Sequence, residues 1–225
     1  MAVAVMAPLI GLSVGLATSP LASAAQSSSV GAVAGGHGAV GSGSNARSGP
    51  AAGGALGTVA SVSKSSFTMT TSAGQDVTVD EWSSTKYLKG TGSISAKTIK
   101  RGTPVLVLGT TSGTTIKATQ VIVQSTTSTG SATSSASKVI AFQRGATTTS
   151  KTVGQIPASY SQGSGTIVSG TEANKATKAA LAAYPGGIVD RVVKLSNGEY
   201  EVHYIGVNWP HHIFVNQAFQ VVGAG

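Results

Sequence analysis

The stretch "GIVDRVVKLSNGEYEVHYI", residues 187–205, contains two strand-like runs with a tight turn between them. Asn197-Gly198 separates the runs, and this dipeptide is the strongest short signal for a two-residue hairpin because both residues tolerate positive φ. From Tyr200 to Tyr204 apolar and polar residues alternate, which is the period of a half-buried strand. The stretch therefore predicts an antiparallel hairpin in the C-terminal part of the chain.

A helix is expected directly before this hairpin, in "TEANKATKAALAAYPGG". Thr171 is a favourable N-cap residue, and the Pro-Gly-Gly sequence stops the helix. The apolar residues of this segment recur at helical spacing, at Ala173, Ala176, Ala180, Leu181 and Tyr184. A third strand-like run, Ile213–Val222, follows the hairpin and is interrupted near Gln217. For residues 171–225 we expect an α+β domain, in which the helix packs on an antiparallel sheet.

This C-terminal block resembles the PepSY domain over about residues 171–223. The resemblance is carried by "AALAAYPGG", "GIVDRVVKLSNGEYEVHYI" and "IFVNQAFQVVGAG", in this order and spacing. It implies a non-catalytic module of protease propeptides and cell-envelope proteins that is proposed to restrain peptidases. The chain departs from the family pattern at "GVNWPHH", where a polar turn is usual, and at Asn216, where an acidic residue is common.

A second block, residues 56–124, is expected to be mainly β. Short runs with period-2 alternation, bounded by Gly and Ser, predict five strands, and five such strands suggest a small closed or nearly closed barrel. Residues 83–101 interrupt the pattern and are expected to form a loop or short helix that plugs one end of the barrel. Its inward-pointing residues would be Tyr87, Leu88, Ile94 and Ile99.

The second block is similar to a family of exported bacterial OB-like domains of unknown function. The similarity is carried by "GTVASVSKSSFTMTTSAGQDVTVD", the later Thr85, "IKRGTPVLVLGT" and "TIKATQVIV". It implies an OB-like five-stranded barrel and little else, although OB-like barrels often bind sugars or oligonucleotides.

The remaining segments are expected to be targeting or linking sequence. Residues 1–25 are uncharged and apolar and end in Ala-Ser-Ala-Ala, which predicts a secretory signal peptide cleaved near Ala24 or Ala25. Residues 26–55 are expected to be a disordered Gly/Ala/Ser tether, and residues 125–170 a Ser/Thr-rich spacer with poorly defined strands. No later segment has the pattern of a membrane span. We therefore expect a secreted, extracellular protein, either free or associated with the cell wall.

The composition limits the classes of partner and the kinds of chemistry that can be expected of the protein. The chain has no cysteine, which excludes thiol catalysis and cysteine-bound metal. Its 15 basic and 7 acidic residues give a net charge of +8, which favours anionic partners. Aromatic residues make up only 5%, and no nucleic-acid-binding motif is present, so nucleic acid is not expected. Motifs of nucleophilic, zinc-protease or nucleotide-binding sites are also missing, so a non-enzymatic protein is expected.

The candidate site residues are concentrated near the C-terminus, at His203, Trp209, His211 and His212. We interpret the histidines as part of a polar sheet face, with Glu199, Glu201 and His203 directed to solvent. Alternatively, His203, His211, His212 and Glu201 form a zinc or copper site, because imidazole and carboxylate suit these metals. The metal alternative requires supporting hydrogen bonds to the ligands, and the sequence shows none.

Three functional hypotheses follow from these observations. The first is an exported or cell-envelope binding module without a cofactor, which uses Trp209, His211, His212 and His203 to hold its partner. The partner would be an extracellular peptide, a peptidase or an anionic wall polymer. The second is a metal-binding protein that uses His203, His212 and Glu201. The third is a structural surface protein that needs none of these side chains.

Overall fold

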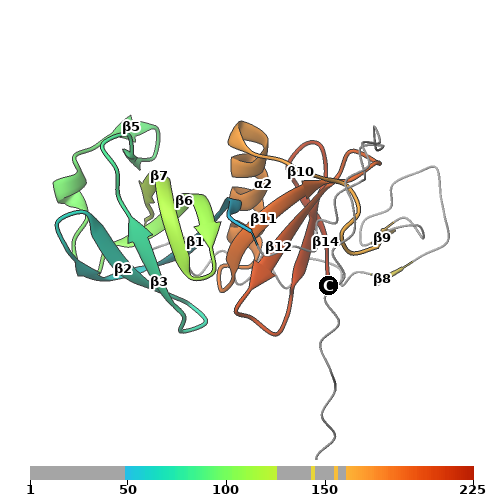
Figure 1. Cartoon of the computed structure of the whole chain (residues 1–225), viewed down its shortest axis with the longest axis horizontal. Coiled ribbons are helices and arrows are strands. Elements are labelled where there is room, and N and C mark those ends of the chain that lie inside the picture. The colour runs from blue at the N-terminus through green and yellow to red at the C-terminus, as the bar shows by residue number, and fades with distance from the viewer. Residues whose placement is uncertain (1–48, 126–142, 145–154, 157–160) are drawn as a thin grey trace, which may run out of the picture. The chain divides into compact units, whose positions relative to one another are not determined.

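The computed structural model describes residues 49–125, 143–144, 155–156 and 161–225. The predicted signal peptide, most of the tether and most of the spacer lie outside these residues. The described part of the chain is mainly β, with a single α-helix, α2, at Gly170–Ala183 (Figure 1). Two short strands from the spacer, β8 (Gln143–Arg144) and β9 (Gln155–Ile156), pair in parallel with each other.

Five strands close into the predicted barrel. They are β1 (Ala51–Val62), β2 (Ser66–Thr71), β3 (Asp76–Asp80), β6 (Pro104–Ser112) and β7 (Thr115–Val123). The order around the barrel is β1-β2-β3-β7-β6, and β6 pairs again with β1. All of these pairs are antiparallel except β3–β7, which is parallel. Alternate residues of the strands fill the interior, led by Val59, Phe67, Met69, Val77, Val79, Val107 and Ile116.

The segment predicted to plug the barrel forms more regular structure than expected. It contains β4 (Lys86–Lys89), β5 (Gly92–Ser93) and the 3-10 helix η1 (Ala96–Thr98). The β4 strand pairs in parallel with β7, so it extends the sheet instead of forming a loop. Ile99 is buried in the barrel interior, and Tyr87 packs against the same cluster. Leu88 packs instead against the core that surrounds α2, and Ile94 is half-buried.

The β1 strand begins at Ala51, so residues 51–55 are not part of a tether as the sequence suggested. The small residues that resemble a flexible linker are here required by close packing. A Cβ at Gly53 would overlap the carbonyl oxygen of Val189, and one at Gly54 would overlap that of Val107. Glycine is the residue that permits such approach of two backbones.

The C-terminal block has the predicted helix followed by an antiparallel sheet. The strands after the helix are β11 (Ile188–Lys194), β12 (Tyr200–Ile205), β13 (His212–Val215) and β14 (Val221–Ala224). A short strand that precedes the helix, β10 (Thr166–Ile167), pairs with β11. The hairpin β11–β12 turns at Asn197-Gly198, where Gly198 has a φ of 79°, and the break near Gln217 separates β13 from β14. The helix begins two residues earlier than predicted, because Ser169 is the N-cap and not Thr171.

The alanine-rich helix shares one apolar core with both the sheet and the barrel. Ala173, Ala176, Ala180, Leu181 and Tyr184 are buried, as the helical spacing predicted. The same cluster includes Val192, Val202 and Tyr204 of the sheet and Leu106, Leu108 and Ile122 from β6 and β7. Because alanine side chains are small, they allow close packing on more than one side of a helix.

The barrel and the C-terminal sheet are also joined by backbone hydrogen bonds. Gly54 and Ala55 of β1 pair antiparallel with Val189 and Ile188 of β11, which makes the strands of both blocks one continuous sheet. Within the described residues, no helix is long and apolar enough to span a membrane.

Candidate functional site

The structure places the predicted histidines together at one end of the β12–β13 pair. His203 and His212 are directly opposite each other across the two strands, as the alternation suggested. Their ring centroids are 5.1 Å apart, with an angle of 65° between the ring planes. The ring of His211 lies farther away, with its centroid 6.4 Å from that of His203.

The prediction that Glu199, Glu201 and His203 face open solvent is wrong. Glu201 is 2% exposed and Glu199 is 3% exposed, and the side chain of His203 is 13% exposed. A buried carboxylate is costly unless it is paired, and Glu201 is paired with His212, whose Nδ1 lies 2.6 Å from Glu201 Oε1. Tyr200, Val202 and Tyr204 of the same strand do face the helix, as predicted.

Asp190 supplies a second carboxylate that sequence reasoning did not identify. Nδ1 of His203 lies 2.6 Å from Asp190 Oδ1, and Nη1 of Arg191 donates to Asp190 Oδ2 at 3.1 Å. The pairing register shifts between Val189 and Arg191, so Asp190 is the extra residue of a β-bulge. Bulges change the direction of a side chain, which explains why simple alternation along β11 could not place Asp190 beside His203.

Trp209 and His211 are close to this cluster in sequence but have different surroundings. Trp209 is 55% exposed, and its ring packs edge-on against Tyr184 at a centroid distance of 5.6 Å. His211 is exposed, and its Nδ1 lies 3.3 Å from the carbonyl oxygen of Tyr204. The four predicted site residues therefore divide into a paired, mostly buried His203–His212 unit and an exposed Trp209–His211 rim.

The structure does not show a preformed three-ligand metal site. In the chain segments that the structure describes, no group of three His, Asp or Glu side chains is arranged to hold a metal ion. In the histidine cluster, the carboxylates of Asp190 and Glu201 contact imidazole nitrogens, and they occupy the Nδ1 atoms of the two rings.

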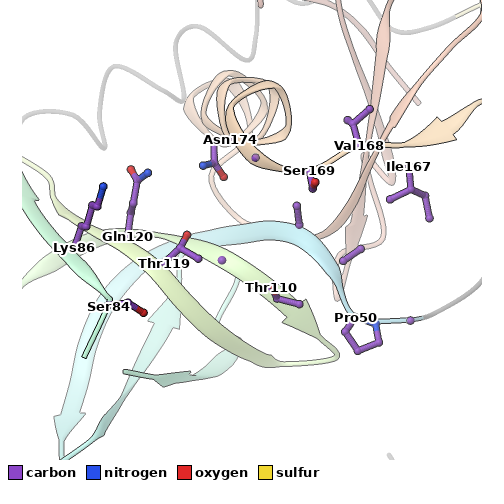
Figure 2. A pocket seen from close by; sticks show the side chains of 15 residues that line it. Pro50, Ser84, Lys86, Thr110, Thr119, Gln120, Ile167, Val168, Ser169 and Asn174 are labelled. Carbon is purple, nitrogen blue, oxygen red and sulfur yellow. The ribbon is translucent and has the colours of Figure 1, made fainter. Parts of the chain in front are cut away.

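A groove of about 1010 Å³ lies elsewhere in the molecule, between the start of β1, strands β6 and β7, and the start of α2 (Figure 2). Its polar lining residues carry hydroxyl, amide or ammonium groups and include Ser84, Lys86, Thr110, Thr119, Gln120, Ser169 and Asn174. The apolar part of the wall is formed by Pro50, Ile167 and Val168. The residues that line the groove include no Asp or Glu, so Lys86 is its one charged side chain.

Lys86 and Gln120 form the polar centre of one wall of this groove. They are register partners in the parallel pair β4–β7, so their backbones lie side by side. In Figure 2 both side chains extend from their strands in the same direction, toward the side where Asn174 lies on α2. No carboxylate of the described residues forms a salt bridge with Lys86. Its ammonium group can therefore pair with an anionic ligand without first leaving a protein partner.

A β-bulge at Thr119 creates this wall. Leu108 pairs with Gln120 while Gly109 pairs with Ala118, which leaves Thr119 as the extra residue. The Thr119 hydroxyl donates to the carbonyl oxygen of Leu108 at 3.1 Å. Two adjacent polar residues, Thr119 and Gln120, therefore line the groove, whereas Ala118 and Val121 on either side of them are buried in the barrel.

The groove was not predicted from the sequence, although one signal in the sequence indicates part of it. In "TIKATQVIV" the apolar residues keep period 2 from Ile116 to Ala118 and then resume at Val121, one position late. Such a change of phase is typical of a bulge, and bulges are frequent next to binding sites. The other wall comes from residues 167–174, far along the chain, which no local pattern could connect to β7.

Comparison of the chain with known protein families, with curated proteins and with solved structures found no match. Its function must therefore be argued from the two sites themselves.

Proposed function

We propose that the protein is an exported, non-enzymatic binding protein of the cell envelope that holds an anionic, hydroxyl-rich wall polymer in the groove. The observation that carries this proposal is the groove lining, which combines many neutral hydrogen-bonding groups with one cation, Lys86. Sugar and polyol chains present many hydroxyls that such groups can bind, and a phosphate or carboxylate on the chain would pair with the ammonium group.

The two resemblances described above are compatible with this role. The barrel order β1-β2-β3-β7-β6, with a parallel β3–β7 pair, supports an OB-like assignment for the first block. The helix and the following antiparallel strands support a PepSY-like assignment for the second block. Export rests on the apolar, uncharged N-terminal sequence. The net charge of +8 would help to attract an anionic polymer over distance.

Calorimetric titration of the protein that begins at Gln26 tests this function. The probes are soluble poly(glycerol phosphate) as the anionic polymer and dextran as a neutral one. We expect binding of the anionic polymer that weakens roughly tenfold in Lys86→Gln, because a charge-assisted contact is lost. Gln120→Ala should also weaken binding. The matched control is Lys89→Gln, which removes the same charge from the same strand outside the groove.

The two polymers and the control variant distinguish binding in the groove from binding by general surface charge. Binding that Lys86→Gln and Lys89→Gln reduce equally would mean that general surface charge holds the polymer, and the groove proposal would fail. Binding of poly(glycerol phosphate) by Lys86→Gln with wild-type affinity would have the same consequence. Equal binding of dextran would show that the charge of the ligand is not recognised.

Peptide or peptidase capture is a second candidate function, and the exposed ring of Trp209 favours it. Packing against Tyr184 holds this ring in place although 55% of the residue is exposed, and a fixed aromatic side chain is a frequent anchor in protein interfaces. In this case Trp209→Ala would abolish retention of a peptidase in a pull-down, and Trp82→Ala, which removes the other exposed tryptophan, would not.

A further inference from the structure

We propose that His203 and His212 bind one divalent transition-metal ion, Cu²⁺ or Zn²⁺, through their Nε2 atoms, while Asp190 and Glu201 orient the two rings. This site is separate from the groove and does not depend on the function proposed for it. None of the four residues lines the groove.

The spacing of the two rings fits a shared ion. Two imidazoles that bind one ion at a nitrogen–metal distance of about 2.0–2.1 Å have ring centroids on the order of 5 Å apart. The His203 and His212 centroids are 5.1 Å apart. The two rings are fixed on adjacent strands by direct cross-strand pairing, so the backbone sets this spacing.

The two carboxylates determine which nitrogen of each ring is available. Asp190 and Glu201 each contact an Nδ1 at 2.6 Å. An ionised carboxylate only accepts hydrogen bonds, so each Nδ1 carries the proton and donates it. In a neutral imidazole, Nε2 then keeps the lone pair that a metal requires. A carboxylate that holds the second nitrogen of a histidine is the usual support of metal-binding imidazoles.

The carboxylates are themselves held in place. Glu201 is 2% exposed, and Asp190 also accepts a hydrogen bond from Arg191, whose side chain is 5% exposed. Restriction of the carboxylates restricts the rings that donate to them. The structure therefore contains the supporting hydrogen bonds that the metal alternative requires. They come from Asp190 and from Glu201. In this arrangement Glu201 supports a histidine ligand and is not itself the ligand that the sequence had suggested.

His211 does not complete the site. Its ring centroid is 6.4 Å from that of His203, and its Nδ1 is directed to the Tyr204 carbonyl oxygen. The ion would have two protein ligands, and water would fill the other positions. Such a site binds more weakly than a closed four-ligand zinc site. Because divalent copper generally binds nitrogen ligands more tightly than zinc, we expect the site to prefer Cu²⁺.

Calorimetric titration with CuCl₂ and with ZnCl₂, each against the protein from Gln26 onward, tests the affinity. We expect one ion per chain and tighter binding of Cu²⁺. His203→Ala and His212→Ala should each remove the binding. Asp190→Asn and Glu201→Gln should weaken it by about 10- to 100-fold, as loss of a supporting partner typically does. The matched controls His37→Ala and His211→Ala should bind as the wild type does.

Electron paramagnetic resonance of the wild-type Cu²⁺ complex gives a readout that does not depend on the folding of any variant. We expect splitting from two imidazole nitrogens. Flat titrations of the wild type, coordination by fewer than two imidazoles, or affinity that survives both His203→Ala and His212→Ala would overturn the proposal. Because the polymer titration uses other residues, failure of the metal site and failure of the groove can be told apart.

Discussion

Gly53 of the barrel and Val189 of the C-terminal sheet approach each other so closely that a Cβ at position 53 would overlap the Val189 carbonyl oxygen. The next residue, Gly54, is the register partner of Val189. This contact is where the β1 strand, which closes the barrel, also continues the sheet of the C-terminal block. Absence of a side chain is therefore a structural requirement at this position.

We expect Gly53→Ala to destabilise the protein by about 1–3 kcal/mol, because an added methyl group in a fully packed region forces the backbone to shift. Urea unfolding followed by circular dichroism measures the free energy of unfolding. Gly92→Ala is the matched control, since its Cβ would meet only the Lys89 carbonyl oxygen at an ordinary 3.6 Å. Equal stability of the two variants would show that the contact at Val189 is not tight in solution.

The barrel and the C-terminal block should unfold together, because they share strand pairing and an apolar core. Each block contains one of the two tryptophans, Trp82 and Trp209. The single-tryptophan variants Trp209→Phe and Trp82→Phe therefore report the unfolding of each block by fluorescence. We expect equal midpoints in urea once the effect of each substitution on total stability is subtracted. Two separate transitions would contradict a shared core.

Leu181→Ala extends this test, because Leu181 is 1% exposed in the cluster that includes both barrel and sheet residues. We expect a loss of about 2–5 kcal/mol from the cavity that the substitution leaves. Both tryptophan signals should shift to lower urea by the same amount. The exposed neighbour provides the control, as Ala182→Ser should change neither signal. A shift of only the Trp209 signal would limit the role of Leu181 to the C-terminal block.

Stability should fall at alkaline pH because of Tyr204. Burial, with a smaller effect of Tyr184, raises the pKa of the Tyr204 phenol well above its ordinary value of 10.0. Below pH 10 the phenol is protonated in both the folded and the unfolded chain. Above pH 10 the unfolded chain loses this proton while the folded chain keeps it, so the free energy of unfolding decreases as pH rises.

Tyr204→Phe provides the comparison for this pH effect. It should be less stable than the wild type at pH 7, by about 1–3 kcal/mol, since the Tyr204 hydroxyl donates to the Tyr184 carbonyl oxygen at 2.8 Å. Its stability should decrease less steeply between pH 10 and pH 11.5. Some slope will remain, because burial also raises the pKa of Tyr184 and, with the Glu81 contact, that of Tyr87. Parallel pH profiles would exclude Tyr204 as the cause.

Thr85 connects the loop before β4 to the barrel, and its hydroxyl should be needed for stability. This hydroxyl accepts a hydrogen bond from the Trp82 amide and donates one to the Ala118 carbonyl oxygen, at 2.9 and 2.8 Å. Thr85→Val keeps the shape and removes both bonds, so we expect a loss of about 1–3 kcal/mol. Thermal unfolding of this variant beside Ser83→Ala, an exposed control, measures the effect. Equal stability of the two variants would contradict a net stabilisation by these two hydrogen bonds.

The sequence predicted those features that depend on local pattern. The Asn197-Gly198 turn, the apolar stripe on α2 and the alternation of the barrel strands each appear within a few consecutive residues. The opposition of His203 and His212 also followed from alternation, once the two strands were assumed to pair.

The features that the sequence did not predict depend on a partner strand or on distant packing. Asp190 and Thr119 are extra residues of bulges, and a bulge is defined by the pairing register and not by one strand alone. The burial of Glu201 depends on tertiary packing. Gly53 and Gly54 have a composition typical of a linker, and only contact with Val189 and Val107 reveals that they are packed.

The bulge at Thr119 has a consequence for how such a protein can diversify. Thr119 and Gln120 line the groove, while Ala118 and Val121 on either side of them keep the barrel filled. The lining of the groove can therefore change through substitutions at two neighbouring positions without alteration of the residues that fill the barrel. The extra residue of the bulge separates the part of β7 that lines the groove from the part that fills the barrel.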